Sequence, residues 1–223
     1  MTLFRRAKNL VSRKIFKLLV RTSSRTDLHK FGTLYGGWIV PADLLTKDSV
    51  CYLAGVGEDI SFDLEIIEQF GCTVYAIDPT PKAIAYVEAA ETPSRFNLLP
   101  VGLWSSDTDL RFYAPTDPSH VSHSIVNLQE TTDYFVAPVR SLVSLMAEQN
   151  HDHIALLKID IEGAEYEVID HIISSDVDIK ILCIEFDQPT SMRKMITYVR
   201  RLQKHGYSPV AVDAWNVTFV LSR

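Results

Sequence analysis

Two patterns of apolar residues alternate along most of the chain. Short apolar runs, typical of buried parallel strands, stand at residues 50–54, 73–77, 95–101, 154–161 and 180–186. Segments with apolar residues every three or four positions separate them and predict amphipathic helices. Two more β-like runs, 207–212 and 217–221, predict a closing hairpin. The pattern predicts an α/β fold with a mostly parallel sheet.

Residues 50–81 contain a strand, a glycine turn, a helix and a second strand in that order. The first strand ends at Gly55-Val56-Gly57, and the second ends at Asp78, 21 positions after Gly57. An acid at the tip of the second parallel strand can accept hydrogen bonds from two ribose hydroxyls. This order therefore predicts a site for a cofactor that carries adenosine.

The charge beside the glycine turn favours one cofactor over another. Glu58 and Asp59 follow the glycines directly and would repel the pyrophosphate of a dinucleotide. They suit a cationic ligand without phosphate, such as S-adenosylmethionine (SAM). Alternatively, both acids only complement the dipole and cap the first turn of the helix. A nicotinamide-dependent oxidoreductase and a SAM-binding protein without turnover are the other functional interpretations.

Further candidate residues stand where the predicted strands end, because ligands bind at the carboxyl ends of such strands. Candidates for cofactor binding are Pro79, Gly102, Leu103 and Asp160, and Trp104 is a candidate for covering the cofactor or the substrate. Tyr35 and Trp38, which flank the glycine turn at 36–37, are candidates for the same covering role. For each of the two tryptophans, the alternative is a place in the hydrophobic core.

Three acids and one histidine are candidates for the chemical step. Asp160, Glu162 and Glu165 follow the strand at 154–161, although acids there also suit a helix N-terminus without a ligand. Residues 109–140 contain β-like pieces at 110–113, 123–128 and 135–139 and predict a β-excursion beside the active face. His123, in the polar run 119–124, is a candidate general base, although a histidine in a loop is more often only solvated.

A metal-assisted reaction is a less favoured alternative. Asp160, Glu185 and Asp187 would supply the oxygen ligands that Mg²⁺ prefers. Carboxylates at strand tips are also common in proteins without a metal. We therefore predict no metal ligands.

The charge of the chain is distributed unevenly. Residues 1–30 hold nine Lys and Arg and one acid, which leaves a net charge of −14 on residues 31–223. Such an acidic domain argues against a nucleic-acid partner. The apolar spacing in 1–30 predicts a helical extension that packs on its own domain or on another subunit. Peripheral contact with an anionic membrane is the alternative.

The remaining sequence features favour a cytoplasmic protein. No apolar stretch approaches the roughly 20 residues that span a bilayer, and no cleavable signal is recognisable. Cys51, Cys72 and Cys183 lack metal-ligand spacing and are interpreted as buried free thiols in a reducing compartment. The sequence leaves the oligomeric state open.

The run LLKIDIEGAEYEVI at residues 156–169 resembles the signature segment of the FkbM family of SAM-dependent methyltransferases. Residues 55–63 and 77–81 resemble the cofactor segments of one branch of that family. The resemblance covers about residues 31–221. It implies a class I methyltransferase fold, with a seven-stranded sheet, an antiparallel last strand and helices on both faces. It also implies a hydroxyl acceptor on a sugar, glycan or other natural product.

The resemblance also implies roles for individual residues. Gly55, Gly57 and Glu58 would hold the methionine part of SAM, and Asp78 would hold its ribose. Asp160, together with Glu162, would face the sulfonium and the acceptor.

The first strand departs from the usual form of this class. Leu53 or Ala54 stands where an acid often precedes the glycines. Glu58 is therefore the candidate to replace that acid as the anchor of the SAM amino group.

Overall fold

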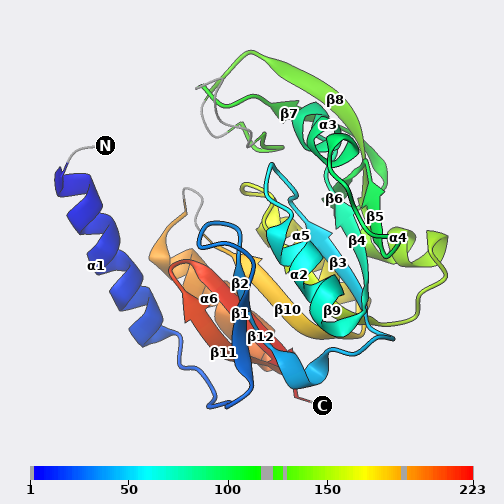
Figure 1. Cartoon of the computed structure of the whole chain (residues 1–223). Coiled ribbons are helices and arrows are strands. Elements are labelled where there is room, and N and C mark those ends of the chain that lie inside the picture. Colours follow the sequence, from blue (N-terminus) through cyan, green and yellow to red (C-terminus); the bar gives the residue numbers. More distant parts are fainter. Residues whose placement is uncertain (1–2, 117–122, 128–129, 187–189, 223) are drawn as a thin grey trace.

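The computed structural model describes residues 3–116, 123–127, 130–186 and 190–222, with the backbone alone at residues 3–9. Its centre is a seven-stranded sheet in the order β11-β12-β10-β9-β3-β4-β5 (Figure 1). The strands are β3 (Val50–Ala54), β4 (Thr73–Ile77), β5 (Phe96–Leu99), β9 (Ile154–Ile159), β10 (Ile179–Glu185), β11 (Tyr207–Asp213) and β12 (Asn216–Leu221). Neighbours pair in parallel, except that β12 is antiparallel to β10 and β11. The predicted sheet with an antiparallel last strand is confirmed.

Helices cover both faces of this sheet, as predicted. They are α1 (Leu3–Leu19), α2 (Ser61–Phe70), α3 (Pro81–Ala89), α4 (Leu142–Glu148), α5 (Glu165–Ser175) and α6 (Met192–Lys204), with a 3-10 turn η1 (Ala42–Leu44). Successive strand residues point to opposite faces. Tyr52 and Ala54 pack with α4, α5 and α6, whereas Cys51 and Leu53 pack with α2 and α3. Burial on both faces explains the continuous apolar runs of the sequence.

Two smaller sheets flank the carboxyl ends of the central strands. An antiparallel hairpin joins β1 (Leu28–Phe31) to β2 (Trp38–Pro41). A second sheet has the order β6-β8-β7 and is made of β6 (Gly102–Trp104), β7 (Thr108–Tyr113) and β8 (Tyr134–Ser141). The sequence predicted such a β-excursion, but of the expected strand at 123–128 only a single bridge between Ser124 and Tyr113 is observed. Leu128 lies outside the described residues.

The β1–β2 hairpin connects the start of the described chain to its last two strands. Lys30 forms an ion pair with Asp213 at 2.9 Å. The hydroxyl of Thr218 donates a hydrogen bond to the backbone oxygen of Ile39 at 2.6 Å. The hairpin therefore forms a wall between β11–β12 and the helix α2.

The basic N-terminal segment contains α1, which lies beside α6 (Figure 1). Phe16 is fully buried, with its ring centroid 5.4 Å from that of Trp215 and 6.3 Å from that of Phe186. Val20 is also buried, and Ser23 donates a backbone hydrogen bond to Pro209. One side of the α1 region thus belongs to the core of the domain.

The cysteines and the helix lengths agree with the sequence analysis. Cys51, Cys72 and Cys183 are free and buried. Burial raises the pKa of the Cys183 thiol to about 12, which favours an inert neutral thiol. No helix in the described part of the chain is long and apolar enough to cross a membrane.

Candidate active site

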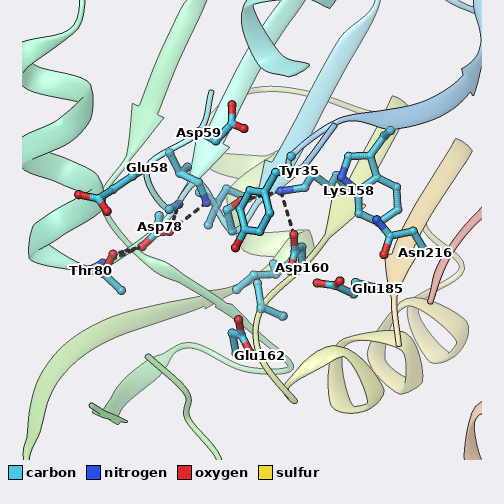
Figure 2. A pocket seen from close by; sticks show the side chains of 18 of the residues that line it. Tyr35, Glu58, Asp59, Asp78, Thr80, Lys158, Asp160, Glu162, Glu185 and Asn216 are labelled. Atoms are coloured by element: carbon cyan, nitrogen blue, oxygen red, sulfur yellow. Dashed lines mark hydrogen bonds and ion pairs between the residues drawn. The ribbon is translucent and has the colours of Figure 1, made fainter. Parts of the chain in front are cut away.

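A cavity of about 530 Å³ lies at the carboxyl ends of β3, β4 and β9 (Figure 2). Its wall also includes the β1–β2 loop, the start of β6 and the turn between β11 and β12. This is the position at which open α/β sheets bind their ligands, and the volume falls in the range of small-molecule sites.

Nearly all of the predicted site residues line this one cavity. They are Tyr35, Trp38, Gly55, Val56, Gly57, Glu58, Asp59, Asp78, Pro79, Gly102, Leu103, His123, Asp160 and Glu162. Trp104 is not among the lining residues. Its side chain is half-buried and packs against the cluster of Phe112, Ala137 and Val139 in the β6-β8-β7 sheet.

Gly55 is the point where three strands come together. Its backbone has a φ of +88°, and a Cβ built there would lie 1.8 Å from the backbone oxygen of Asp160. Gly55 donates its N–H to Ile77, and Asp160 donates its N–H to Ala54. A side chain at position 55 cannot be accommodated, because the ends of β3, β4 and β9 are held in contact around this residue.

The carboxylate of Asp78 is engaged by the protein itself. Oδ2 accepts hydrogen bonds from the N–H groups of Val56 at 2.9 Å and Gly57 at 3.1 Å. Oδ1 accepts from the N–H of Thr80 at 2.8 Å and from its hydroxyl at 2.6 Å. A carboxylate offers about four acceptor positions, and all four are used here. Asp78 thus fixes the glycine turn and the start of α3 in one geometry.

Asp59 attaches the β1–β2 loop to the glycine turn. Its carboxylate accepts hydrogen bonds from the hydroxyl of Thr33 at 2.6 Å and from the N–H of Ser61 at 2.9 Å. Although burial opposes ionisation, hydrogen bonds from Ser61 and Thr33 lower the pKa of this carboxyl. Leu34 and Tyr35 at the tip of the loop are 94% and 91% exposed. The loop is therefore held at its base, while its apolar tip faces solvent at the rim of the cavity.

Lys158 is a buried cation in the floor of the cavity. Its Nζ donates to the backbone oxygen of Gly55 at 2.6 Å and lies 3.6 Å from Oδ2 of Asp160 (Figure 2). The hydrogen bond links β9 to the glycine turn, and the ion pair orients Asp160. Asp160 follows the last residue of β9, so its side chain projects into the cavity beyond the sheet.

Glu165 lies under the loop that follows β9 and is not among the cavity-lining residues. Its carboxylate accepts hydrogen bonds from the N–H groups of Ile161 and Gly163. Burial raises the pKa of Glu165 to about 7, even though these backbone hydrogen bonds lower it. Glu162, at the bend, has a φ of +54° and lines the cavity. Of the three acids predicted near the reaction, Asp160 and Glu162 therefore reach the cavity, whereas Glu165 supports their loop.

The cavity is rich in negative charge. Among the residues that the structure describes, seven carboxylate residues line it, namely Glu58, Asp59, Asp78, Asp160, Glu162, Glu185 and Asp213, against the three cations Arg13, Lys30 and Lys158. Figure 2 shows most of these carboxylates around one space. A surplus of carboxylates favours a cationic ligand and disfavours a polyphosphate.

Comparison with known proteins identifies the family. A family model described as Methyltransferase FkbM domain matches residues 54–209, which is more than half of the chain. The chain belongs to the FkbM methyltransferase family. No curated protein matches it. Membership makes this protein a SAM-dependent methyltransferase. It therefore supports the methyltransferase interpretation over the nicotinamide-dependent oxidoreductase.

Several residues that line the cavity were not predicted as site residues, although two of them had a recognisable signal. Lys158 interrupts an otherwise apolar strand, and a lysine in a buried strand requires a partner. Thr80 lies two positions after Asp78, where a hydroxyl can bond back to the acid. Arg13, Lys30 and Asn216 come from distant parts of the chain, and only the folded structure brings them together.

The possible metal site of the FkbM domain is only partly visible. Asp160 and Glu185 both line the cavity, but Asp187 lies outside the described residues. Within the described residues, no group of three or more His, Cys, Asp or Glu is arranged to hold a metal ion. His123 lines the cavity too, with its ring 5.2 Å from the ring of Phe135.

Asp63 is a buried acid on α2, one turn behind the glycine turn. Among the described residues its Oδ1 has no hydrogen-bond partner. Burial raises its pKa to about 7, although the charge of Lys158 lowers it. The unfolded chain releases this proton near pH 4, so the unfolded state binds fewer protons than the folded state between about pH 4 and 7. Stability must therefore fall as the pH rises through this window.

We expect Asp63→Asn to flatten this pH dependence. Asn keeps the shape of the side chain but needs no proton. The variant and the wild type should therefore have the same free energy of unfolding near pH 4. By pH 8 the free energy of unfolding of the variant should exceed that of the wild type by up to about 4 kcal/mol. Urea unfolding at several pH values measures both curves. The raised pKa of Glu165 affects the pH dependence of both proteins equally, so its contribution cancels when the two curves are subtracted. Parallel curves would show that Asp63 is already ionised in the fold at low pH.

Proposed function

We propose that this FkbM methyltransferase transfers a methyl group from SAM to a hydroxyl oxygen of a small molecule, such as a sugar, a glycan or another natural product. The single observation that carries the proposal is that the glycine turn, a surplus of carboxylates and two candidate proton acceptors line one cavity. The acidic domain and this enclosed cavity favour a small acceptor over a nucleic acid.

The residues of the cavity fit SAM. Glu58, which is exposed beside the glycine turn, is suited to the ammonium group, and Leu103 offers an apolar surface for the adenine. The ribose hydroxyls would share the oxygens of Asp78 with four donors of the chain, so Asp78 would act largely by holding the turn. Bound SAM supplies a methyl group on a positively charged sulfur.

Methyl transfer to oxygen requires alignment and the removal of one proton. The bond from carbon to the acceptor oxygen forms as the bond from carbon to sulfur breaks, and the hydroxyl proton must go to a base. His123 is the better candidate for that base, because Asp160 is already paired with Lys158. Asp160 would then orient the acceptor and complement the positive sulfur, and the surrounding walls would exclude water.

We expect His123→Ala to separate turnover from binding. Loss of a general base lowers turnover by about 100-fold or more, while SAM affinity should change little. Calorimetric titration with SAM, with NAD in a parallel cell, measures binding. Release of S-adenosylhomocysteine with a panel of hydroxylated sugars and natural products measures turnover. His153→Ala is the matched control, since His153 is exposed and pairs with Asp152 outside the cavity.

Two results would contradict the proposal, and a third would change the base. Binding of NAD in place of SAM would contradict the assigned cofactor. A methylated product whose new methyl group is attached to nitrogen, sulfur or carbon, as determined by NMR, would contradict the acceptor class. Equal turnover of His123→Ala and wild type would exclude His123 and leave Asp160 for the same test with Asp160→Asn.

A further inference from the structure

The helix α1 carries an apolar face that the domain does not cover. Phe16 and Val20 pack inward, but Val11, Ile15 and Leu18 follow one another at a spacing of four and three residues on another face. These three side chains, with the neighbouring Leu10 and Leu19, are 45–78% exposed. An exposed apolar stripe of this kind on a helix marks an interaction surface.

The charge of α1 indicates what this surface binds. The helix contains six Lys and Arg and no acidic residue. Among its described side chains, Arg13, Lys14 and Lys17 are exposed, and Lys14 lies next to the apolar stripe. Two copies of such a helix would bring like charges together without acids to balance them. An anionic surface that also accepts apolar side chains satisfies both features at once.

The helix that carries the stripe also borders the cavity, on the side opposite the stripe. Arg13 of α1 lines the cavity together with Leu34 and Tyr35, the exposed tip of the β1–β2 loop. The rim thus combines a cationic helix with an apolar loop tip. Residues 31–223 carry a net charge of −14, so an anionic layer would repel most of the domain and attract its basic helices, α1 and the neighbouring α6.

We propose that α1 lies in the headgroup region of an anionic lipid bilayer, with Val11, Ile15 and Leu18 inserted and the basic side chains at the surface. Membrane docking does not depend on methyl transfer, so it can be tested on the protein without an acceptor.

The test is sedimentation of the full chain with vesicles. We expect binding to vesicles of phosphatidylcholine mixed with phosphatidylglycerol, little binding to phosphatidylcholine alone, and release at high salt. Ile15→Asp should lower the partition coefficient about tenfold or more, because it places a charge on the inserted face. Lys14→Gln with Lys17→Gln should weaken binding to anionic vesicles while leaving the fold intact.

The matched control is Val143→Asp. Val143 and Ile15 are both 45% exposed, but Val143 lies on α4 and outside the cavity. This variant should bind like wild type, and a SAM titration should show that each variant keeps the same cofactor affinity.

Several results would overturn the proposal. One is no binding to anionic vesicles, and another is binding that Ile15→Asp leaves unchanged. A concentration-dependent dimer that Ile15→Asp abolishes, in the absence of vesicle binding, would assign the stripe to a second copy of the chain.

Discussion

Gly55→Ala is expected to abolish SAM binding and to destabilise the fold by on the order of 4 kcal/mol. The backbone of Gly55 is in the left-handed region, and the new Cβ would lie 1.8 Å from the backbone oxygen of Asp160. Either β9 or the glycine turn must move. Movement would break the hydrogen bonds that join Gly55 to Ile77 and Lys158 to Gly55. SAM titration and urea unfolding of the same preparation measure both effects.

Gly71→Ala is the matched control for this variant. Gly71 ends α2 with a φ of +67°, but the nearest atom to its added Cβ is the Cβ of Lys47 at 3.6 Å. Gly71→Ala places the same kind of strain on the backbone without the clash. We therefore expect its free energy of unfolding to fall by about 1–2 kcal/mol and its SAM affinity to stay unchanged. If the two variants lost equal stability, the close approach at Gly55 would have no energetic weight.

Asp78→Asn is the second change with a large expected effect. The amide has one acceptor oxygen in place of two, and its NH₂ group would face donors of the chain. At least one pair of buried donors, either Val56 and Gly57 or the two of Thr80, would lose its acceptor. We expect a loss of about 3 kcal/mol in the free energy of unfolding and a fall of 100-fold or more in SAM affinity.

Glu58→Gln separates the two roles of the acids in the cavity, which are binding of SAM and stabilisation of the fold. Glu58 is exposed, so its replacement should lower SAM affinity through lost charge and leave the unfolding free energy unchanged. If Asp78→Asn behaved in the same way, losing affinity while keeping full stability, the hydrogen bonds of Asp78 to the glycine turn would contribute nothing, and Asp78 would be a ribose ligand alone.

The sequence predicted the elements of the fold well, because their signals are local. Runs of buried apolar residues marked the central strands, and the family signature implied their order and the antiparallel strand. The strand predicted at 154–161 ends earlier, at Ile159, where Asp160 turns into the cavity. Strand ends are set by contacts with neighbouring strands, here with Ala54 and Gly55, and such contacts leave no periodic pattern.

The site was predicted less completely, because the direction of a side chain depends on its partners. An acid at a strand tip can accept hydrogen bonds from a ligand or from the chain itself. The sequence does not show which of these two kinds of donor Asp78 binds. The sequence made Trp104 a candidate for covering the cofactor or the substrate, but its ring packs against Phe112, Ala137 and Val139 instead. Lys30 and Asp213 are 183 positions apart, a separation across which no local rule pairs residues.

That last ion pair has a consequence for biosynthesis. The wall made by the β1–β2 hairpin rests on Asp213 and Thr218, which are among the last residues of the described chain to be translated. The ribosome must therefore make β11 and β12 before the pocket can close, since contacts between distant segments form only after both are available. A nascent chain that already contains the glycine turn and Asp78 would still lack one side of its binding site. Cofactor capture thus requires β11 and β12, and truncations that remove β12 should lose it.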